Sequence, residues 1–287
     1  RSPWSFASAF TQDFKADYLG PVLLVPESMH YSWKKGASLM GLGSDALWPI
    51  ALSSSGRASP DSLRDRILEA RAQRRPILMV VSVAGSTELG SIDPVDEIQD
   101  VLDEFRESDG LHIWHHVDAA YGGFFRSIDP SADGELSSGA FRALHAISRV
   151  NSVTLDPHKL GYVPYASGAI LVRDKRDYAF RSCEEVPYID FDQERDRGPY
   201  TLEGSRSAAG AVATWMTSRT IGLNGRGYGK ILARTVRIRK QLERRLEQEL
   251  VQAGLPLIIA PNADTNILCF SCRRPGEPLA DSNRRTL

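Results

Sequence analysis

The chain has 287 residues, 42 % of them hydrophobic, with 35 basic and 36 acidic side chains and a net charge of −1. These values predict a soluble globular protein of one large domain or one and a half, and they argue against general binding to nucleic acid or to an anionic membrane. Three cysteines, Cys183, Cys269 and Cys272, are too few for a disulfide framework. We expect a cytoplasmic protein with no membrane helix, because its apolar stretches are too short.

Short runs rich in Val, Ile and Leu alternate with longer amphipathic stretches along the chain, which is typical of βαβ units. Such runs indicate strands that are covered on both faces. The predicted fold class is therefore α/β, with a mostly parallel central sheet flanked by helices. The predicted strands are residues 22–25, 77–83, 113–117, 153–155 and 169–172.

Helix signals lie between these strands. Ser59 and Pro60 form a cap followed by proline at the first helical position, and Leu63, Ile67 and Ala70 then recur at helical spacing. The other predicted helices are an amphipathic one over 94–105, a buried alanine-rich one over 207–219 and a long charged one over 228–251.

Residues 257–270 have the pattern of the first strands of a smaller α+β domain. We predict a large domain over residues 1–229 and the start of a small C-terminal domain over residues 230–287, with both the beginning of the first and the end of the second expected to be incomplete. Cys269 and Cys272 are interpreted as strand cysteines, and no metal site is expected. The charge-rich segment 175–199 is interpreted as a functional or disordered loop.

Two residues at strand ends suggest a chemistry. Lys159 follows a β-branched strand and stands beside His158, and Asp118, 41 positions earlier (159 − 118), ends another strand. Open α/β sheets hold their ligands at such carboxyl ends. A lysine amine forms a Schiff base with an aldehyde cofactor, and a carboxylate facing a pyridine nitrogen keeps that ring protonated. The pair therefore points to pyridoxal 5'-phosphate as cofactor.

The run DPHKLGYVPY over residues 156–165, together with HVDAAYGG over residues 116–123, resembles the group II pyridoxal-phosphate-dependent amino acid decarboxylases. The first run is especially similar to the microbial tyrosine decarboxylases, and the resemblance covers residues 21–270. It implies the fold type I of the aspartate aminotransferases, a carboxy-lyase that converts an L-amino acid to its amine and CO₂, and a homodimer with shared active sites.

The resemblance implies roles for individual residues. Lys159 matches the Schiff-base lysine and Asp118 the partner of the pyridine nitrogen. His30 matches the histidine that stacks on the ring and helps to hold the substrate carboxylate, and Ala120 matches the small residue on the other ring face. Without the resemblance, His30 is an ordinary histidine at a helix start.

Four further residues match positions around the cofactor. Thr87 resembles the threonine near the ring hydroxyl, His158 a contact on the phosphate side, and Ser205 the helix start that approaches the phosphate from the partner subunit. Tyr188 resembles the loop tyrosine that reaches the neighbouring subunit and returns a proton after CO₂ leaves. A turn threonine, a helix cap and a surface tyrosine are the ordinary alternatives for Thr87, Ser205 and Tyr188.

The expected substrate is an aromatic, tyrosine-like L-amino acid, with glutamate or aspartate as the alternative, because the sequence does not identify the residues that contact the substrate side chain. Decarboxylation-coupled oxidative deamination and carbon–carbon lyase chemistry are alternative reactions.

Two departures from the family pattern affect phosphate binding. A Ser/Gly/Thr-rich phosphate loop is not found in residues 1–20, and Asp156 stands where other members often have asparagine. The missing loop indicates either a truncated chain, which the abrupt end favours, or a catalytically inactive protein that binds partners.

Overall fold

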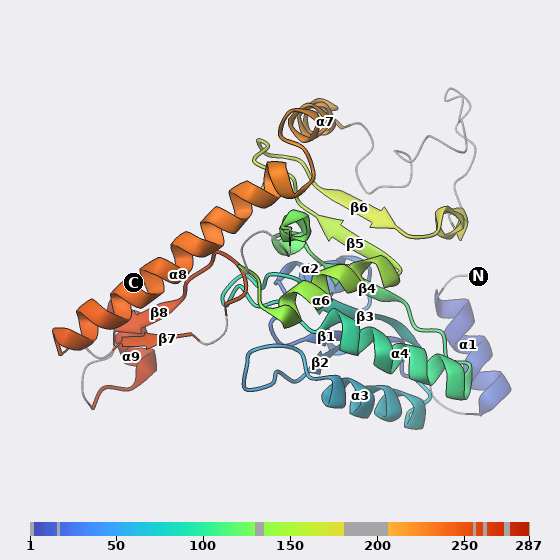
Figure 1. Cartoon of the computed structure of the whole chain (residues 1–287). Helices are drawn as coiled ribbons and strands as arrows, with labels where there is room; N and C mark the ends of the chain where they lie inside the picture. Colours follow the sequence, from blue (N-terminus) through green and yellow to red (C-terminus); the bar gives the residue numbers. More distant parts are fainter. Residues whose placement is uncertain are drawn as a thin grey trace.

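The computed structural model describes residues 3–15, 18–129, 135–180, 206–254, 257–260, 263–272 and 276–286. A six-stranded sheet with the order β2-β1-β3-β4-β5-β6 forms its centre (Figure 1). Every neighbouring pair is parallel except β5 and β6, which are antiparallel, so the predicted mostly parallel sheet is confirmed. The strands are β1 (Val22–Pro26), β2 (Leu47–Ile50), β3 (Ile77–Val83), β4 (His115–Asp118), β5 (Ser152–Leu155) and β6 (Ala169–Val172).

Strand β2 is the one strand of this sheet that the sequence did not predict. It contains Pro49, which lacks the N–H that a central strand needs. The structure places β2 at the edge of the sheet, where it pairs with β1 only. An edge position tolerates proline, which is why a run that looks unsuited to a strand forms one here.

The helices include every one that the sequence predicted. Helix α3 begins as expected, because the Ser59 Oγ accepts a hydrogen bond from the Ser62 N–H and Pro60 occupies the first turn. The helices are α1 (Pro3–Phe14), α2 (Ser32–Leu39), α3 (Pro60–Ala72), α4 (Val95–Asp109), α6 (Ser138–Ala146), α7 (Ala209–Ile221), α8 (Lys230–Gln252) and α9 (Leu279–Thr286).

Alternating side chains of the strands pack against helices on both faces of the sheet. Val22 and Leu24 of β1 lie in a buried cluster with residues of α3 and α4, whereas Leu23 and Val25 lie in a second cluster with Ala37 of α2. Figure 1 shows α3, α4 and α6 together along one side of the sheet. Burial on both faces explains the continuous apolar run of β1. The expected cover on both faces is wrong for the edge strand β6, where the Ile170 and Leu171 side chains are exposed.

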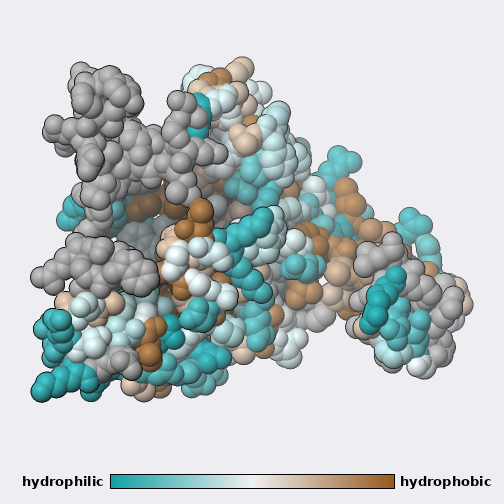
Figure 2. Space-filling view, turned by 180° about the vertical axis from the view of Figure 1, so that it is seen from behind, coloured by the Kyte–Doolittle hydropathy of each residue, from teal (hydrophilic) through white to brown (hydrophobic). Residues whose placement is uncertain are grey.

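The burial predicted for helix α7 is wrong, because none of its residues is buried in this chain. Its small residues instead permit a close approach to a loop: a Cβ at Gly210 would lie 2.3 Å from the Ala166 carbonyl oxygen. The Trp215 and Met216 side chains are exposed, and Figure 2 shows apolar surface where α7 lies. The alanine content of α7 therefore does not reflect burial in the core of this chain.

Helix α8 connects the large sheet to a small one. Leu232 and Val236 at its start belong to a buried cluster of the large sheet. Beyond the end of α8, strands β7 (Leu257–Ile259) and β8 (Phe270–Cys272) form an antiparallel pair, which agrees with the strands predicted in this region. The proposed domain boundary after Gly229 stays a prediction. Within the described ranges, no helix is long and apolar enough to cross a membrane.

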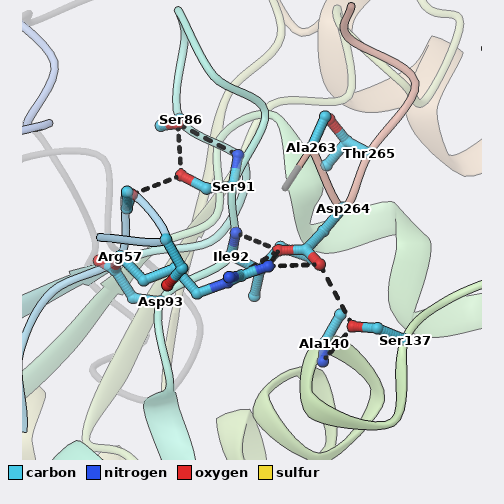
Figure 3. A network of polar contacts seen from close by, with 12 residues as sticks. Arg57, Ser86, Ser91, Ile92, Asp93, Ser137, Ala140, Ala263, Asp264 and Thr265 are labelled. Atoms are coloured by element: carbon cyan, nitrogen blue, oxygen red, sulfur yellow. Dashed lines mark hydrogen bonds and ion pairs between the residues drawn. The ribbon is translucent and has the colours of Figure 1, made fainter. Parts of the chain in front are cut away.

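A polar network ties the C-terminal segment to the large sheet (Figure 3). The Asp264 carboxylate, whose side chain is 4 % exposed, accepts hydrogen bonds from the Arg57 guanidinium at 2.8 Å and from the Ile92 N–H at 2.9 Å. The Ser137 hydroxyl donates a further bond to Asp264 at 3.3 Å. Next to this group, Asp93 accepts bonds from two backbone N–H groups. Every carboxylate of the network is thus held by several donors.

Candidate active site

A cavity of about 300 Å³ lies at the carboxyl ends of the parallel strands. Five of the eight residues predicted for the site line it, although they come from four separate segments of the chain. These five are His30, Thr87, Asp118, Ala120 and Lys159. The structure therefore brings Asp118 and Lys159, the two residues that the sequence placed at strand ends, into one cavity with three residues that the family resemblance assigned to the site. The roles of all five residues stay predictions.

Two glycines allow the loops of the cavity to meet. Gly85, which lines the cavity after β3, has φ +90°, a conformation that side chains with a Cβ rarely adopt. Gly122, in the turn after β4, donates its N–H to the Ala84 carbonyl at 2.9 Å, and a Cβ at Gly122 would lie 2.3 Å from that oxygen. A larger residue at Gly122 would separate the loop after β3 from the loop that follows Asp118.

Lys159 lies in a short turn after β5 and is paired with Asp156. The Lys159 Nζ is 3.0 Å from the Asp156 Oδ2, and the Lys159 side chain is 30 % exposed, so its amine is accessible from the cavity. Asp156, the residue that departs from the family pattern, also faces the His158 Nε2 at 3.4 Å. The Ser167 N–H donates to the His158 Nδ1, which leaves the ring proton of a neutral His158 on Nε2, directed at Asp156.

Asp118 ends β4 and is held by two neutral donors. Its Oδ2 accepts a hydrogen bond from the Trp33 Nε1–H at 3.0 Å, and its Oδ1 accepts one from the Ala120 N–H at 3.3 Å. His116, two residues earlier, is bonded to the hydroxyls of Ser152 at 2.7 Å and Thr154 at 3.1 Å. Burial lowers the pKa of His116, so its ring is neutral at neutral pH and puts no positive charge beside Asp118.

His30 lies at the start of α2 on the rim of the same cavity. Its Nδ1 accepts a hydrogen bond from the Ser32 N–H at 3.3 Å and is 2.8 Å from the Ser32 Oγ. A neutral His30 therefore keeps its proton on Nε2, which is free of these contacts. This geometry allows the Nε2–H to donate to a carboxylate in the cavity.

The residues present fit a polar cofactor. The Ser28 Oγ lies in the cavity lining and is the one buried side-chain N or O atom, among those of the described residues, that has no hydrogen-bond partner. Buried hydroxyls normally have a partner, so an unpaired one in a cavity indicates a place for a ligand atom. Lys159 provides an amine and Asp118 a carboxylate in the same cavity, which is the donor set that pyridoxal phosphate requires.

Other predicted residues are not placed in the cavity. Tyr188 and Ser205 lie outside the described residues. His158 stands beside the cavity, where its ring stacks on that of Tyr165 with centroids 4.1 Å apart. The roles assigned to these three residues stay predictions.

Sequence reasoning missed several residues of the cavity lining. Trp33 follows His30 by three positions, and this spacing is a signal that could have placed both side chains on one side of the turn where α2 begins. Thr154 precedes Asp156 by two positions along β5, which is the spacing of one face of a strand. The sequence contains no comparable signal for Ser28 or for Tyr121, whose hydroxyl donates to Asn266 at 2.7 Å.

Comparisons with known proteins agree with this geometry. The family model described as the pyridoxal-dependent decarboxylase conserved domain matches residues 15–273. The chain belongs to this family. The family is one of pyridoxal-phosphate-dependent carboxy-lyases, so the predicted family, cofactor and enzyme class are confirmed at that level.

Individual relatives support the same assignment. The chain is 33 % identical to the L-tyrosine decarboxylase of Enterococcus faecium over 78 % of its length. It is 35 % identical, over 88 % of its length, to a probable L-tyrosine/L-aspartate decarboxylase of Methanothermobacter thermautotrophicus. The crystal structure of mouse CSAD in its apo form superposes with a TM-score of 0.71 at 25 % identity and covers 92 % of the chain. This likeness confirms fold type I.

The chain spans only part of these relatives. It covers 41 % of the Enterococcus protein, 60 % of the Methanothermobacter protein and 52 % of the mouse CSAD chain. The activity, substrate and partners of the whole protein are therefore treated below as proposals.

Proposed function

We propose that the protein is a pyridoxal-phosphate-dependent decarboxylase that converts an aromatic, tyrosine-like L-amino acid to its amine and CO₂. The observation that carries this proposal is that Lys159 and Asp118 line one cavity at the carboxyl ends of the sheet. These two residues come from different strand ends and have the two chemistries that the family's cofactor needs. Membership of the family supports the same reaction class.

The substrate proposal rests on relatives. The Enterococcus relative is named for L-tyrosine alone, and the Methanothermobacter relative is named for both L-tyrosine and L-aspartate. Tyrosine is therefore the first candidate and aspartate the second. The cavity lining includes the aromatic side chains of Trp33 and Tyr121 beside its polar groups.

Each residue of the site has a proposed part in the reaction. When bound, pyridoxal phosphate supplies an aldehyde that reacts with amines and a protonated pyridine ring that accepts the electron pair left by departing CO₂. Lys159 would hold the cofactor through its amine, which is the group that reacts with an aldehyde. Asp118 pairs with the ring nitrogen and holds the proton there. His30 donates its Nε2–H to the substrate carboxylate, which orients the bond to be broken.

The remaining parts of the proposal concern the partner subunit, Asp156 and the location of the protein. A homodimer with shared sites would bring Tyr188 of the partner subunit to the carbon that needs a proton, and Ser205 of the partner subunit to the phosphate. Asp156, whose Oδ2 lies 3.0 Å from the Lys159 Nζ, would hold the Lys159 amine within the cavity. A cytoplasmic location stays a prediction.

The test is a panel of L-amino acids with the purified protein and pyridoxal phosphate. Tyrosine, phenylalanine, tryptophan, aspartate and glutamate are assayed for release of CO₂, amine, aldehyde and ammonia. The proposal predicts equal amounts of CO₂ and amine, with tyrosine the fastest substrate and no turnover by Lys159→Ala. Aldehyde with ammonia would contradict the amine-forming reaction, and no turnover by a protein that binds the cofactor would contradict a decarboxylase.

A further inference from the structure

A hydrogen bond joins the two sides of the proposed cofactor site. The Trp33 Nε1–H donates to the Asp118 Oδ2 at 3.0 Å, across 85 positions of sequence. Trp33 lies in the first turn of α2, and its backbone N–H donates to the His30 carbonyl at 3.1 Å. One residue thus contacts both the carboxylate proposed for the ring nitrogen and the segment that carries the proposed stacking histidine.

The surroundings of Trp33 fix its indole ring. The ring meets the edge of the His116 ring, with centroids 5.7 Å apart and an interplanar angle of 62°. His116 is itself held by the hydroxyls of Ser152 and Thr154. The indole N–H therefore approaches Asp118 from a defined direction, and an Asp118 side chain that turned away would leave a half-buried N–H without its acceptor.

The chemistry of this contact suits a positioning role. Indole is a neutral donor, so it orients the carboxylate without neutralising its negative charge. With the Ala120 N–H on the other oxygen, both oxygens of Asp118 are fixed, yet each keeps a lone pair that faces away from its donor. Donors behind a functional group commonly fix its orientation in this way, and their loss weakens ligand binding.

We propose that Trp33 is a positioning residue that aligns Asp118 with the ring nitrogen of the bound cofactor. This inference rests on the proposed function, because it assumes that pyridoxal phosphate occupies the cavity. It predicts that Trp33 contributes to binding through the ring nitrogen and contributes little when that nitrogen is absent.

The experiment compares two ligands and two variants by equilibrium dialysis. The ligands are pyridoxal phosphate and its analogue with a carbon atom in place of the ring nitrogen. Trp33→Phe removes the N–H and keeps an aromatic ring, and Trp48→Phe is the matched control, since Trp48 lies on β2 and packs against the buried core. Trp33→Phe is expected to weaken binding of pyridoxal phosphate about tenfold, as for loss of one charge-assisted hydrogen bond, and to leave binding of the analogue unchanged.

Two further variants complete the test. In an Asp118→Ala background, Trp33→Phe should cause no additional loss, because both changes remove the same interaction. Trp33→His, which retains a ring N–H, should recover part of the affinity, and it replaces Trp33→Phe if that variant does not fold. Equal losses for both ligands, or no loss for either, would overturn the inference. Failure of the wild-type protein to bind pyridoxal phosphate would instead overturn the proposed function.

Discussion

Two groups of acidic residues lie at strand ends or in the loops that follow them, and they differ in burial. In the network of Figure 3, Asp264 and Asp93 accept bonds from a guanidinium, a hydroxyl and backbone N–H groups, and both are buried. In the cavity, Asp118 and Asp156 are partly exposed, and the Ser28 hydroxyl has no hydrogen-bond partner among the described residues. The buried network stabilises the fold, whereas the partly exposed carboxylates of the cavity are accessible to a ligand.

Substitution of Asp264 is expected to have the largest effect on the free energy of unfolding. Asp264→Ala would remove a buried carboxylate that accepts hydrogen bonds from the Arg57 guanidinium and the Ile92 N–H, so the free energy of unfolding should fall by about 3 kcal/mol. Urea unfolding followed by circular dichroism measures this. The matched control is Glu249→Ala, which removes an exposed ion pair with Arg245 and should change the same quantity by less than about 0.5 kcal/mol. A similar effect of the two changes would contradict the structural role of the network.

Asp118→Ala should show the reverse pattern. Its free energy of unfolding should stay within about 1 kcal/mol of wild type, because the carboxylate is only partly buried. The dissociation constant for pyridoxal phosphate should rise about 100-fold, since a charge-assisted hydrogen bond contributes roughly 1.5–3 kcal/mol. Equilibrium dialysis and urea unfolding on the same preparation compare the two effects. Loss of stability with unchanged cofactor affinity would place Asp118 in the structural group.

Buried His115 predicts a dependence of stability on pH. Burial lowers its pKa from 6.5 to about 3, so between these values the unfolded chain binds more protons and the free energy of unfolding rises with pH. The slope is at most about 1.4 kcal/mol per pH unit. Burial raises the pKa of Asp93 from 3.8 to about 6, and between these values the folded chain binds more protons, which opposes the rise.

His115→Gln separates the two contributions, because glutamine does not titrate. The stability of wild type relative to this variant should increase as the pH rises from about 4 to 6. Urea unfolding at several pH values measures the difference. A constant difference would show that His115 does not change its protonation on folding.

The smallest effect is expected for Ser28→Ala. The Ser28 hydroxyl has no partner in the described residues, so its removal should leave the free energy of unfolding within about 0.5 kcal/mol of wild type. Affinity for pyridoxal phosphate should fall about fivefold, as for one neutral hydrogen bond. Ser137→Ala is the matched control, because it removes a hydroxyl of the buried network of Figure 3. It should lower the free energy of unfolding without lowering cofactor affinity.

The sequence predicted those parts of the fold that depend on local patterns. Strands β3 and β6 were predicted with their observed bounds because their apolar runs end at clear turn residues. Strand β2 was missed because Pro49 looks unfavourable until its edge position is known. The burial predicted for α7 was wrong because alanine content does not show what covers a helix.

In the site, too, residues marked by a local pattern could be predicted, whereas contacts that depend on tertiary packing could not. Lys159 and Asp118 could be predicted because each follows a strand, and all parallel strands present their carboxyl ends at one edge. The bond from Trp33 to Asp118 could not, because it depends on how α2 packs beside β4. Ser28 could not be predicted either, since an unfilled hydrogen bond is a property of the folded structure.

The central claim is that the cavity holds pyridoxal phosphate through Lys159, and covalent trapping tests it most directly. The protein is incubated with pyridoxal phosphate, reduced with borohydride, digested and mapped by mass spectrometry, with Lys159→Ala in parallel. The account predicts one modified peptide, carrying the reduced cofactor on Lys159, and no modification of the variant at any cavity residue. Modification of surface lysines alone, to the same extent in both proteins, would contradict it.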